Sequence, residues 1–293
     1  MRLFCSGVTL LPCRSSIRLG KAAGQLTSRV LKERTAIAHG NLRTAFGETL
    51  SQPEREKIIR SLFRLLGESL IESLIFTRED VQNNIRIQGM EHLDAALSKG
   101  RGAIILAPHM GAWELASYAL GLHVEHASTV YKPLKNPFVN NYLIRNREKI
   151  VHLNLIPSRN ALRMILQKLR KGYMIVMLFD QNAGKNGLPA TFFGKTAFTY
   201  SAPALFAMKT GCPVIPGYIM KEPEFRRHRI TINEPFPVLD TGNRDRDILA
   251  NTQQYNDFFE GLVRKHPDQW FGWLHRRWKV PRAFSVKTGS AAR

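Results

Sequence analysis

The spacing of hydrophobic positions changes near residue 76. Up to that point apolar residues recur at helical spacing, and the stretch 51–76 begins like a helix, with Ser51 as N-cap and Pro53 and Glu54 in the first turn. Beyond it, short apolar runs alternate with helical patterns. We predict strands at 102–107, 128–131, 173–179, 212–219 and 228–233, and helices at 112–122, 136–149, 160–171, 200–210 and 245–265.

Strands that alternate with helices predict an α/β fold, with a mixed, largely parallel sheet flanked by helices. The chain has 293 residues and contains no internal repeat or long linker. We divide it into a helical, basic region that associates with a membrane (1–75), an α/β domain that carries the chemistry (76–282) and a C-terminal tail (283–293).

The N-terminal region has two interpretations. The longest uncharged run near the start, 3–13, has 11 residues and includes Pro12; a membrane-spanning helix needs about 20 apolar residues. No clean signal-peptide cleavage site follows. Apolar and cationic residues instead interleave, as in a basic amphipathic helix on a membrane surface; the alternative is an ordinary surface helix packed on the domain. The residues are Leu10, Leu11, Ile17, Leu19, Leu26, Val30 and Leu31 with Arg14, Arg18, Lys21, Arg29 and Lys32.

Charge narrows the choice of partner. The chain has 43 Lys and Arg against 23 Asp and Glu, a net charge of +20, and the excess is concentrated at the two ends. Such a balance indicates an anionic partner, either nucleic acid or an anionic membrane surface. The three cysteines form no C-x-x-C pair, so we predict no metal site or disulfide framework, and a reducing, cytosolic setting.

The stretch "LAPHMGAWELA" (106–116) is the first candidate for chemistry. His109 follows a predicted strand, where ligands bind in open α/β sheets, and Gly111 permits a tight turn. On one straight helix His109 and Glu114 would lie roughly 140° apart, so the carboxylate can reach the imidazole only if the chain bends at Gly111. The pair would then be a general base and its orienting group. Alternatively, His109 caps the helix and Glu114 is a first-turn acid.

Three further polar stretches complete the pattern: "VYKPLKNPFVNNYLIRNR" (130–147), "FDQNAGKNGLPATFFGKTAFT" (179–199) and "HPDQWFGWLHRRWK" (266–279). The first two follow predicted strands. The third mixes tryptophans with cations and could be an interfacial anchor, a surface on which bases stack, or a packed C-terminal element.

H-x4-E after a strand, then "YKPLKNP", "FDQN…FFGK" and "PDQWFGWLHRRWK" together resemble the bacterial lipid A late acyltransferases (lauroyl and myristoyl acyltransferases), within the wider H-x4-D/E acyltransferases. "AHGNLRTAF" (38–46) is similar to the family's N-terminal signature. The resemblance covers about residues 30 to 282. It implies an enzyme that transfers an acyl chain from an acyl carrier protein thioester to a hydroxyl of a lipid A precursor, without a cofactor.

The resemblance also implies roles for four site residues. His109 is the general base and Glu114 orients it. Arg147 contacts the oxyanion or a phosphate, with Arg145 as the competing candidate. Asp180 shapes the site or holds an arginine; its alternative is an Asx-turn.

Substrate contacts are expected from Lys132, Asn136, Lys195, Arg276 and Arg277, although each cation could equally be solvated. Lys132 stands where the family commonly has an arginine, which keeps the charge but loses the bidentate fork.

The implied partners are acyl carrier protein or acyl-CoA as donor, a lipid A precursor or another lipid as acceptor, and an anionic membrane surface. Family members typically begin with a membrane-spanning or deeply hydrophobic helix, whereas this segment is short and interrupted by charge. We therefore expect peripheral or monotopic attachment to the cytoplasmic face of the bacterial inner membrane.

Two other classes of function would each suit part of the sequence. A basic nucleic-acid-binding module would suit the charge, but no binding motif is present. A lipid-binding pseudoenzyme would lack His109 or Glu114, and both are present.

Overall fold

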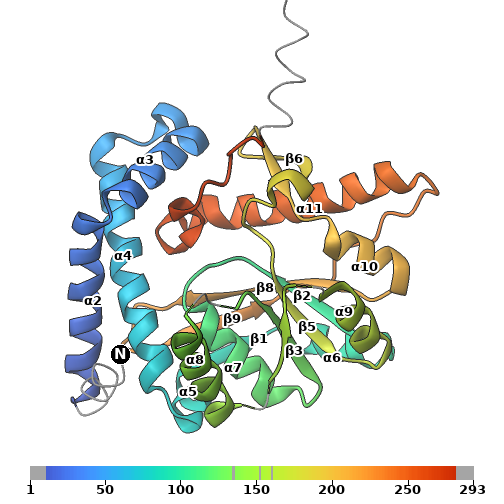
Figure 1. The fold of residues 1–293 in the computed structure, drawn as a ribbon, viewed down its shortest axis with the longest axis horizontal. Helices are drawn as coiled ribbons and strands as arrows, with labels where there is room; N and C mark the ends of the chain where they lie inside the picture. Colours follow the sequence, from blue (N-terminus) through green and yellow to red (C-terminus); the bar gives the residue numbers. More distant parts are fainter. Residues whose placement is uncertain (1–10, 134–135, 152, 160, 282–293) are drawn as a thin grey trace, which may run out of the picture.

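A mixed seven-stranded sheet forms the centre of the molecule (Figure 1). The computed structural model describes residues 11–133, 136–151, 153–159 and 161–281. The strand order is β1-β9-β8-β2-β5-β3-β4. Neighbouring strands are parallel except β8 and β9, which confirms the predicted α/β fold. The strands are β1 Ile85–Gln88, β2 Ala103–Ala107, β3 Ala127–Tyr131, β4 Asn154–Pro157, β5 Met174–Leu178, β8 Val214–Lys221 and β9 His228–Ile232.

Helices cover both faces of the sheet (Figure 1). They are α2 Cys13–Val30, α3 Lys32–Phe46, α4 Gln52–Ile75, α5 Arg78–Asn84, α6 Met90–Leu97, α7 Trp113–His123, α8 Pro137–Ile150, α9 Ala161–Arg170, α10 Ala202–Thr210 and α11 Arg244–Lys265, with the short 3-10 turns η1 Gly47–Thr49, η2 Gly184–Asn186, η3 Pro267–Gln269 and η4 Phe271–Leu274. Ser51 does precede α4, and its backbone N–H donates to Glu54 (2.7 Å). Within the described ranges, no helix combines the length and the hydrophobicity that crossing a bilayer requires.

The central strands are apolar throughout because both of their faces are buried. Along β2, Ile104 and Leu106 join a core shared with α3, α4, α9, α10 and α11. Ala103 and Ile105 join the opposite core, which α6 and α7 cover. This alternation follows from the two-residue period of a strand.

Two short edge strands and a hairpin were not predicted. β1 and β4 have four residues each and lie at the two ends of the sheet. The hairpin, β6 Leu188–Phe192 and β7 Lys195–Thr199, lies inside the stretch that we interpreted as a loop. Its turn places Phe193 and Gly194 at positive φ (54° and 67°). Glycine and asparagine favour this conformation, so a phenylalanine at the first of these positions does not predict a hairpin turn.

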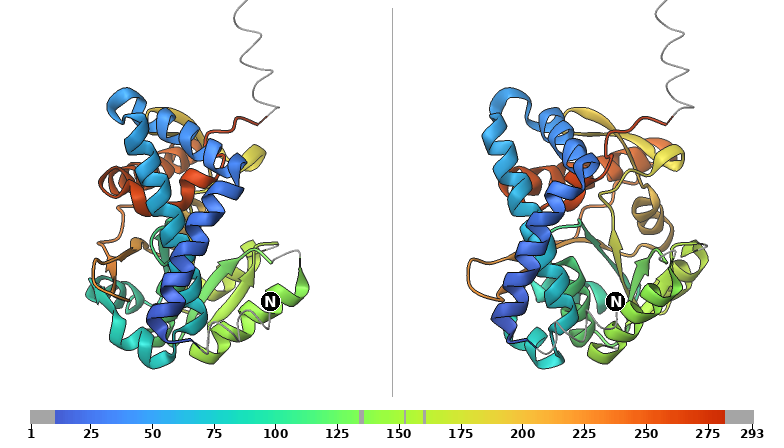
Figure 2. Two further views of the ribbon diagram at one scale, coloured as in Figure 1. Left: turned by 90° about the vertical axis from the view of Figure 1, so that its left-hand side faces the viewer. Right: turned by 60° about the vertical axis from the view of Figure 1, so that its left-hand side comes forward.

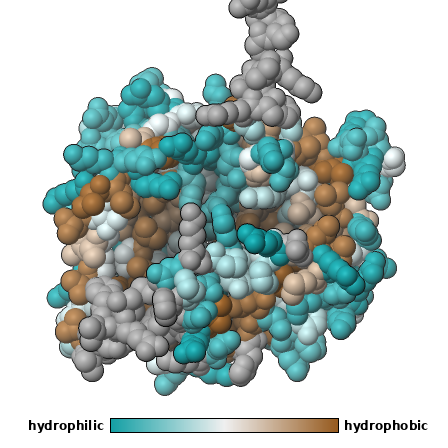
Figure 3. Space-filling model, viewed as in Figure 1, coloured by the Kyte–Doolittle hydropathy of each residue, from teal (hydrophilic) through white to brown (hydrophobic). Residues whose placement is uncertain are grey.

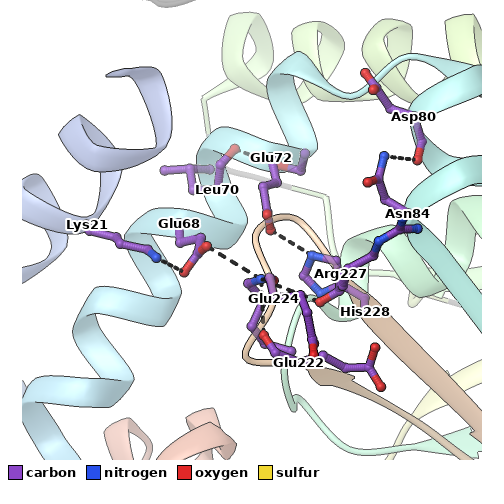
Figure 4. A network of polar contacts seen from close by, with 12 residues as sticks. Lys21, Glu68, Leu70, Glu72, Asp80, Asn84, Glu222, Glu224, Arg227 and His228 are labelled. Atoms are coloured by element: carbon purple, nitrogen blue, oxygen red, sulfur yellow. Dashed lines mark hydrogen bonds and ion pairs between the residues drawn. The ribbon is translucent and has the colours of Figure 1, made fainter. Parts of the chain in front are cut away.

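The N-terminal helices pack against the sheet domain. α2 runs beside α4 in both views of Figure 2, and the two helices touch backbone to backbone where Gly20 and Gly24 meet Gly67. Polar contacts also connect α4 to its neighbours (Figure 4): Glu68 pairs with Lys21 of α2 (3.1 Å) and with Lys221 of β8 (3.8 Å). Glu72 pairs with His228 (3.0 Å), and both side chains are fully buried. The boundaries proposed for the three regions stay a prediction; Leu10 and the tail 283–293 lie outside the described residues.

We expect Gly67→Ala to destabilise the protein, because the new Cβ would fall against the carbonyl oxygen of Gly20. Overpacking of this kind costs about 1–3 kcal/mol, which should lower the midpoint of chemical denaturation. Gly40→Ala is the matched control: Gly40 lies in α3 with open space around its Cβ position, so this change should be neutral or stabilising. Equal effects of the two substitutions would contradict the packing argument.

Candidate active site

His109 and Asp180 meet because of the register of β2 and β5. Ala107 and Leu178 are paired in the parallel ladder, and each candidate residue stands two positions beyond one of them. The imidazole Nδ1 of His109 lies 2.6 Å from Asp180 Oδ1, and the backbone N–H of His109 donates to Oδ2 (2.8 Å). The indole N–H of Trp270 donates to the same Oδ2 (2.6 Å). The buried carboxylate thus accepts three hydrogen bonds.

These contacts set the charge of the pair. Burial by itself lowers the pKa of His109, but the charge and hydrogen bond of Asp180 outweigh it, with help from the charge of Glu114, so the pKa lies above its ordinary value of 6.5. Burial raises the pKa of the Asp180 carboxyl, and the charge and hydrogen bonds of its partners reverse this, so its pKa stays below the ordinary value. Asp180 is therefore an anion at neutral pH, and His109 Nδ1 carries a proton toward it.

The carboxylate hydrogen-bonded to His109 is thus Asp180, which corrects the prediction that Glu114 orients the imidazole. Glu114, in the first turn of α7, instead accepts from Arg147 of α8 through Nε (3.2 Å) and a terminal nitrogen (2.5 Å). Spacing within one motif could not reveal this contact, because the acid that binds the ring lies 71 residues away in the sequence. Asp180 was expected to shape the site or hold an arginine; it holds the histidine.

The chain does bend at Gly111. This residue has φ +54°, and a Cβ there would fall against the carbonyl oxygen of Ile219. His109 therefore lies in the loop before α7, as predicted. The C-terminal segment pairs with this loop: Gly111 N–H donates to Gln269 O (3.0 Å), and Phe271 N–H donates to His109 O (2.9 Å).

The "PDQWFGWLHRRWK" stretch is a packed element that supports the site. Trp270 and Trp273 are fully buried, which excludes their use for stacking nucleic-acid bases or anchoring in an interface. Asn41, from "AHGNLRTAF", donates to the carbonyl oxygens of Trp273 (2.8 Å) and His275 (2.6 Å). The N-terminal signature therefore holds the C-terminal one in place.

Arg277 does not face a substrate, contrary to the prediction. Its side chain is buried and donates to Phe198 O (3.1 Å), Thr199 Oγ1 (2.8 Å) and Asn256 Oδ1 (3.3 Å). Burial lowers its pKa to about 10, so the guanidinium remains charged at neutral pH. Its function is to join the β6–β7 hairpin to α11.

The other predicted substrate-binding residues lie at the surface. Lys132 lines the mouth of the cavity described below. Asn136 precedes α8, where its carbonyl oxygen accepts from Asn140 N–H (3.0 Å). Lys195 lies at the exposed start of β7, outside the described lining of the cavity. Arg276 is exposed and pairs with Glu33 (2.8 Å).

Sequence reasoning missed two polar side chains beside His109. Gln181 Nε2 lies 3.4 Å from His109 Nε2 and also 3.4 Å from His275 Nε2. Gln181 belongs to the motif "FDQN" and His275 to "WLHRRW". Their contacts are with residues of other motifs, so the spacing within one motif gave no signal for them.

A cavity of about 710 Å³ opens in front of the imidazole. Its lining is mainly hydrophobic and comes from both faces of the sheet: Ile105, Val176, Ile219, Ile230 and Ile232 on the α7 side, and Ile165, Leu162, Pro203 and Phe206 on the α9–α10 side. Its polar residues include His109, Glu114, Arg147, Gln181 and His275. Over the described ranges, no three His, Cys, Asp or Glu side chains are grouped so that they could hold a metal ion.

The chain is similar in sequence to known proteins. The family model of the bacterial lipid A biosynthesis acyltransferases matches residues 2–280. The chain is 26% identical to a lipid A biosynthesis palmitoleoyltransferase of Escherichia coli (strain K12), over 89% of this chain and 84% of the relative. It is 25% identical to a lipid A biosynthesis lauroyltransferase of the same strain, over 93% and 88%. A phosphatidylinositol mannoside acyltransferase of Mycobacterium tuberculosis (strain ATCC 25618 / H37Rv) is 27% identical, over 63% and 57%.

An imidazole–carboxylate pair at the mouth of an apolar cavity, together with these relatives, defines an acyltransferase. The chain belongs to the bacterial lipid A biosynthesis acyltransferase family, as the motifs had indicated.

Proposed function

We propose that this enzyme transfers a fatty acyl chain from an acyl carrier protein thioester to a hydroxyl of a lipid A precursor. One observation carries the proposal: His109, with Asp180 on Nδ1, presents Nε2 to a cavity whose lining is mainly hydrophobic. A cavity of that kind suits an acyl chain, and an imidazole with one nitrogen held by a carboxylate suits proton abstraction from a hydroxyl.

The reaction proceeds in two steps. The acceptor hydroxyl attacks the thioester carbonyl carbon while His109 Nε2 takes its proton, and the carbonyl electron pair moves to oxygen. When the tetrahedral intermediate collapses, the carbon–sulfur bond breaks and the thiolate takes the proton from His109. Asp180 stabilises the transient imidazolium and fixes the tautomer.

Glu114 and Arg147 act beside the reacting atoms. The charge of Glu114 favours protonated His109. Arg147 binds Glu114 through two of its nitrogens, and a guanidinium has five N–H donors. We assign its remaining capacity to a phosphate of the acceptor. Lys132, Asn136, Lys195 and Arg276 are the further candidates for polar contacts to donor or acceptor around the entrance.

The test compares lipids from cells with and without this protein by mass spectrometry. We expect a lipid A species to lose one acyl chain when the gene is deleted. Purified enzyme is then assayed with acyl carrier protein and CoA thioesters, and with a lipid A precursor and a phosphatidylinositol mannoside as acceptors. A preference for the mannoside, or for CoA thioesters, would contradict the finer assignment while leaving acyl transfer intact.

We also propose that α2 attaches the enzyme to an anionic membrane surface. Leu19, Leu26 and Val30 follow a seven- and four-residue spacing and are 45%, 59% and 69% exposed, whereas Ile17, Gly20 and Gly24 face α4. Exposed cations flank this stripe at Arg18, Arg29 and Lys32. Figure 3 shows hydrophobic residues beside hydrophilic ones on the α2–α4 side of the molecule, and others on the opposite side. A face of this composition suits an interfacial helix.

Leu26→Glu should therefore weaken cosedimentation with vesicles of phosphatidylcholine and phosphatidylglycerol by about tenfold, since it adds a charge where apolar area would be buried. High salt should weaken binding of the wild type as well. Leu249→Glu, at an exposed leucine of α11, is the matched control and should bind like the wild type. If Leu26→Glu binds as well as Leu249→Glu does, α2 is not the attachment surface.

A further inference from the structure

We propose that Gln181 is a further catalytic residue of this acyl transfer, and that its side-chain amide donates a hydrogen bond to the oxyanion of the tetrahedral intermediate. His275 is the positioning residue that holds the amide. The inference rests on the proposed function and adds to it the group that stabilises the negative charge.

The side-chain amide of Gln181 lies next to the atom of His109 that would take the proton. Its Nε2 is 3.4 Å from His109 Nε2, the atom that must come within hydrogen-bond distance of the acceptor hydroxyl. The carbonyl under attack has to lie beside that hydroxyl. An amide next to Nε2 therefore adjoins the place where the carbonyl oxygen becomes charged, and an oxyanion donor acts at about 3 Å.

The orientation of the amide follows from the tautomers of the two imidazoles. Asp180 accepts the proton on His109 Nδ1, so in the neutral imidazole, the form that can act as a base, Nε2 is an acceptor, and the Gln181 group that faces it must be the NH₂. Burial lowers the pKa of His275, so its ring is neutral and its Nε2 can accept as well (3.4 Å). One amide nitrogen thus divides its two hydrogens between two imidazoles.

This arrangement releases one donor when substrate arrives. The acceptor hydroxyl takes over His109 Nε2 and displaces one Gln181 N–H, while His275 retains the other and keeps the amide in place. Both contacts are long for a hydrogen bond to nitrogen, which makes the exchange inexpensive. The freed N–H then donates to the carbonyl oxygen as the new carbon–oxygen bond forms.

The backbone N–H groups of residues 109 to 111 are already engaged. The backbone N–H of His109 donates to Asp180, that of Met110 to Pro108 O (2.9 Å), and that of Gly111 to Gln269 O (3.0 Å). Arg147, which the resemblance suggested for the oxyanion or a phosphate, binds Glu114 through two nitrogens, and its remaining donors are assigned above to a phosphate of the acceptor. These engagements leave Gln181 as the donor best placed beside Nε2.

The support around Gln181 is rigid, as an oxyanion donor requires. Asn41 fixes the carbonyl oxygen of His275 (2.6 Å). The residue after Gln181, Asn182, donates to the carbonyl oxygens of Arg277 (2.9 Å) and Lys279 (2.8 Å). The motif that carries the glutamine and the motif that carries the histidine are therefore joined on both sides of the amide.

The test measures steady-state acyl transfer by Gln181→Met, which keeps the volume and removes the donor without adding charge. We expect kcat to fall about 10²–10³-fold with KM changed less than about threefold. Gln181→Glu, which keeps the size but has no donor when ionised, should lose at least as much. Gln167→Met, at an exposed position of α9, is the matched control and should turn over like the wild type.

The role of His275 is tested by a double-mutant cycle. His275→Phe should lower kcat about tenfold in the wild type but less than about twofold in Gln181→Met, because it acts through the amide. His275→Gln, which restores an acceptor, should recover most of the loss. Independent effects in the cycle would overturn the positioning role.

The activity of the wild type distinguishes failure of the proposed function from failure of the Gln181 proposal. If it transfers acyl groups to none of the acceptors, the proposed function fails. If it is active and Gln181→Met keeps kcat within about threefold, the Gln181 proposal fails and the function stands.

Discussion

His109→Ala should abolish acyl transfer while leaving the fold and membrane binding intact. General bases contribute about 10²–10⁴-fold to rate, and the described surroundings of the cavity place no second imidazole against a carboxylate: His275, the other histidine of its lining, contacts Gln181 instead. Asp180 retains the N–H of residue 109 and the indole of Trp270, so the site should not collapse. The measurement is turnover of acyl carrier protein thioester with detergent-solubilised lipid, alongside a thermal melt.

Two further variants make this result interpretable. His109→Gln leaves Asp180 a polar neighbour but supplies no base, and it should be as inactive as the alanine variant. His123→Ala, at the other end of α7, removes a histidine that is not part of the cavity lining and should be fully active. Near-normal turnover by His109→Ala would mean that another group takes the proton.

The sequence located His109 because the relevant signals are local. A buried strand has a continuous apolar run, and its end marks the edge of the sheet where His109 lies. Gly111 marked the turn, and its positive φ confirms that interpretation. Elements such as α7, α8 and α11 were predicted within one or two residues, because long periodic segments carry their own evidence.

The carboxylate that binds His109 could not be found in that way. His109 meets Asp180 only because β5 lies next to β2, and strand order is a property of the whole chain. The environment of Arg277 likewise depends on segments distant in sequence. Its neighbours in sequence suggested a basic surface, but its guanidinium is buried and donates to Thr199 and Asn256. The β6–β7 hairpin was hidden because Phe193 occupies a turn position that normally signals itself through glycine or asparagine.

The two carboxylates near His109 can be distinguished by pH, which gives the second large effect. His109 must be neutral to act, and its pKa is raised, so wild-type kcat/KM should rise with pH through a value above 6.5 and fall on the acid side of it. Asp180→Asn removes the main cause of that upward shift while burial remains. The acid limb should therefore move to lower pH.

The maximal rate of Asp180→Asn should nevertheless fall, although more of its His109 is neutral at a given pH. In Asp180→Asn an amide can donate to Nδ1, which leaves the proton on Nε2 and removes the basic lone pair from the cavity; the loss should be on the order of 10³–10⁴-fold. General damage to the fold would lower the rate but would not move the acid limb to lower pH. The combination of both effects would therefore indicate the specific role of Asp180. Unfolding should be followed in parallel, since Asp180 also binds Trp270.

Glu114→Gln is the matched comparison, because it also converts a carboxylate near His109 into an amide. Glu114 acts on the imidazole through charge alone and is the smallest of the named influences on its pKa, so the acid limb should move only slightly. The rate should fall by about tenfold, from the weakened pair with Arg147, and not from a change of tautomer. If Glu114→Gln shifted the acid limb further than Asp180→Asn, the orienting role would belong to Glu114 after all, and the contact between His109 and Asp180 would have to change when substrate binds.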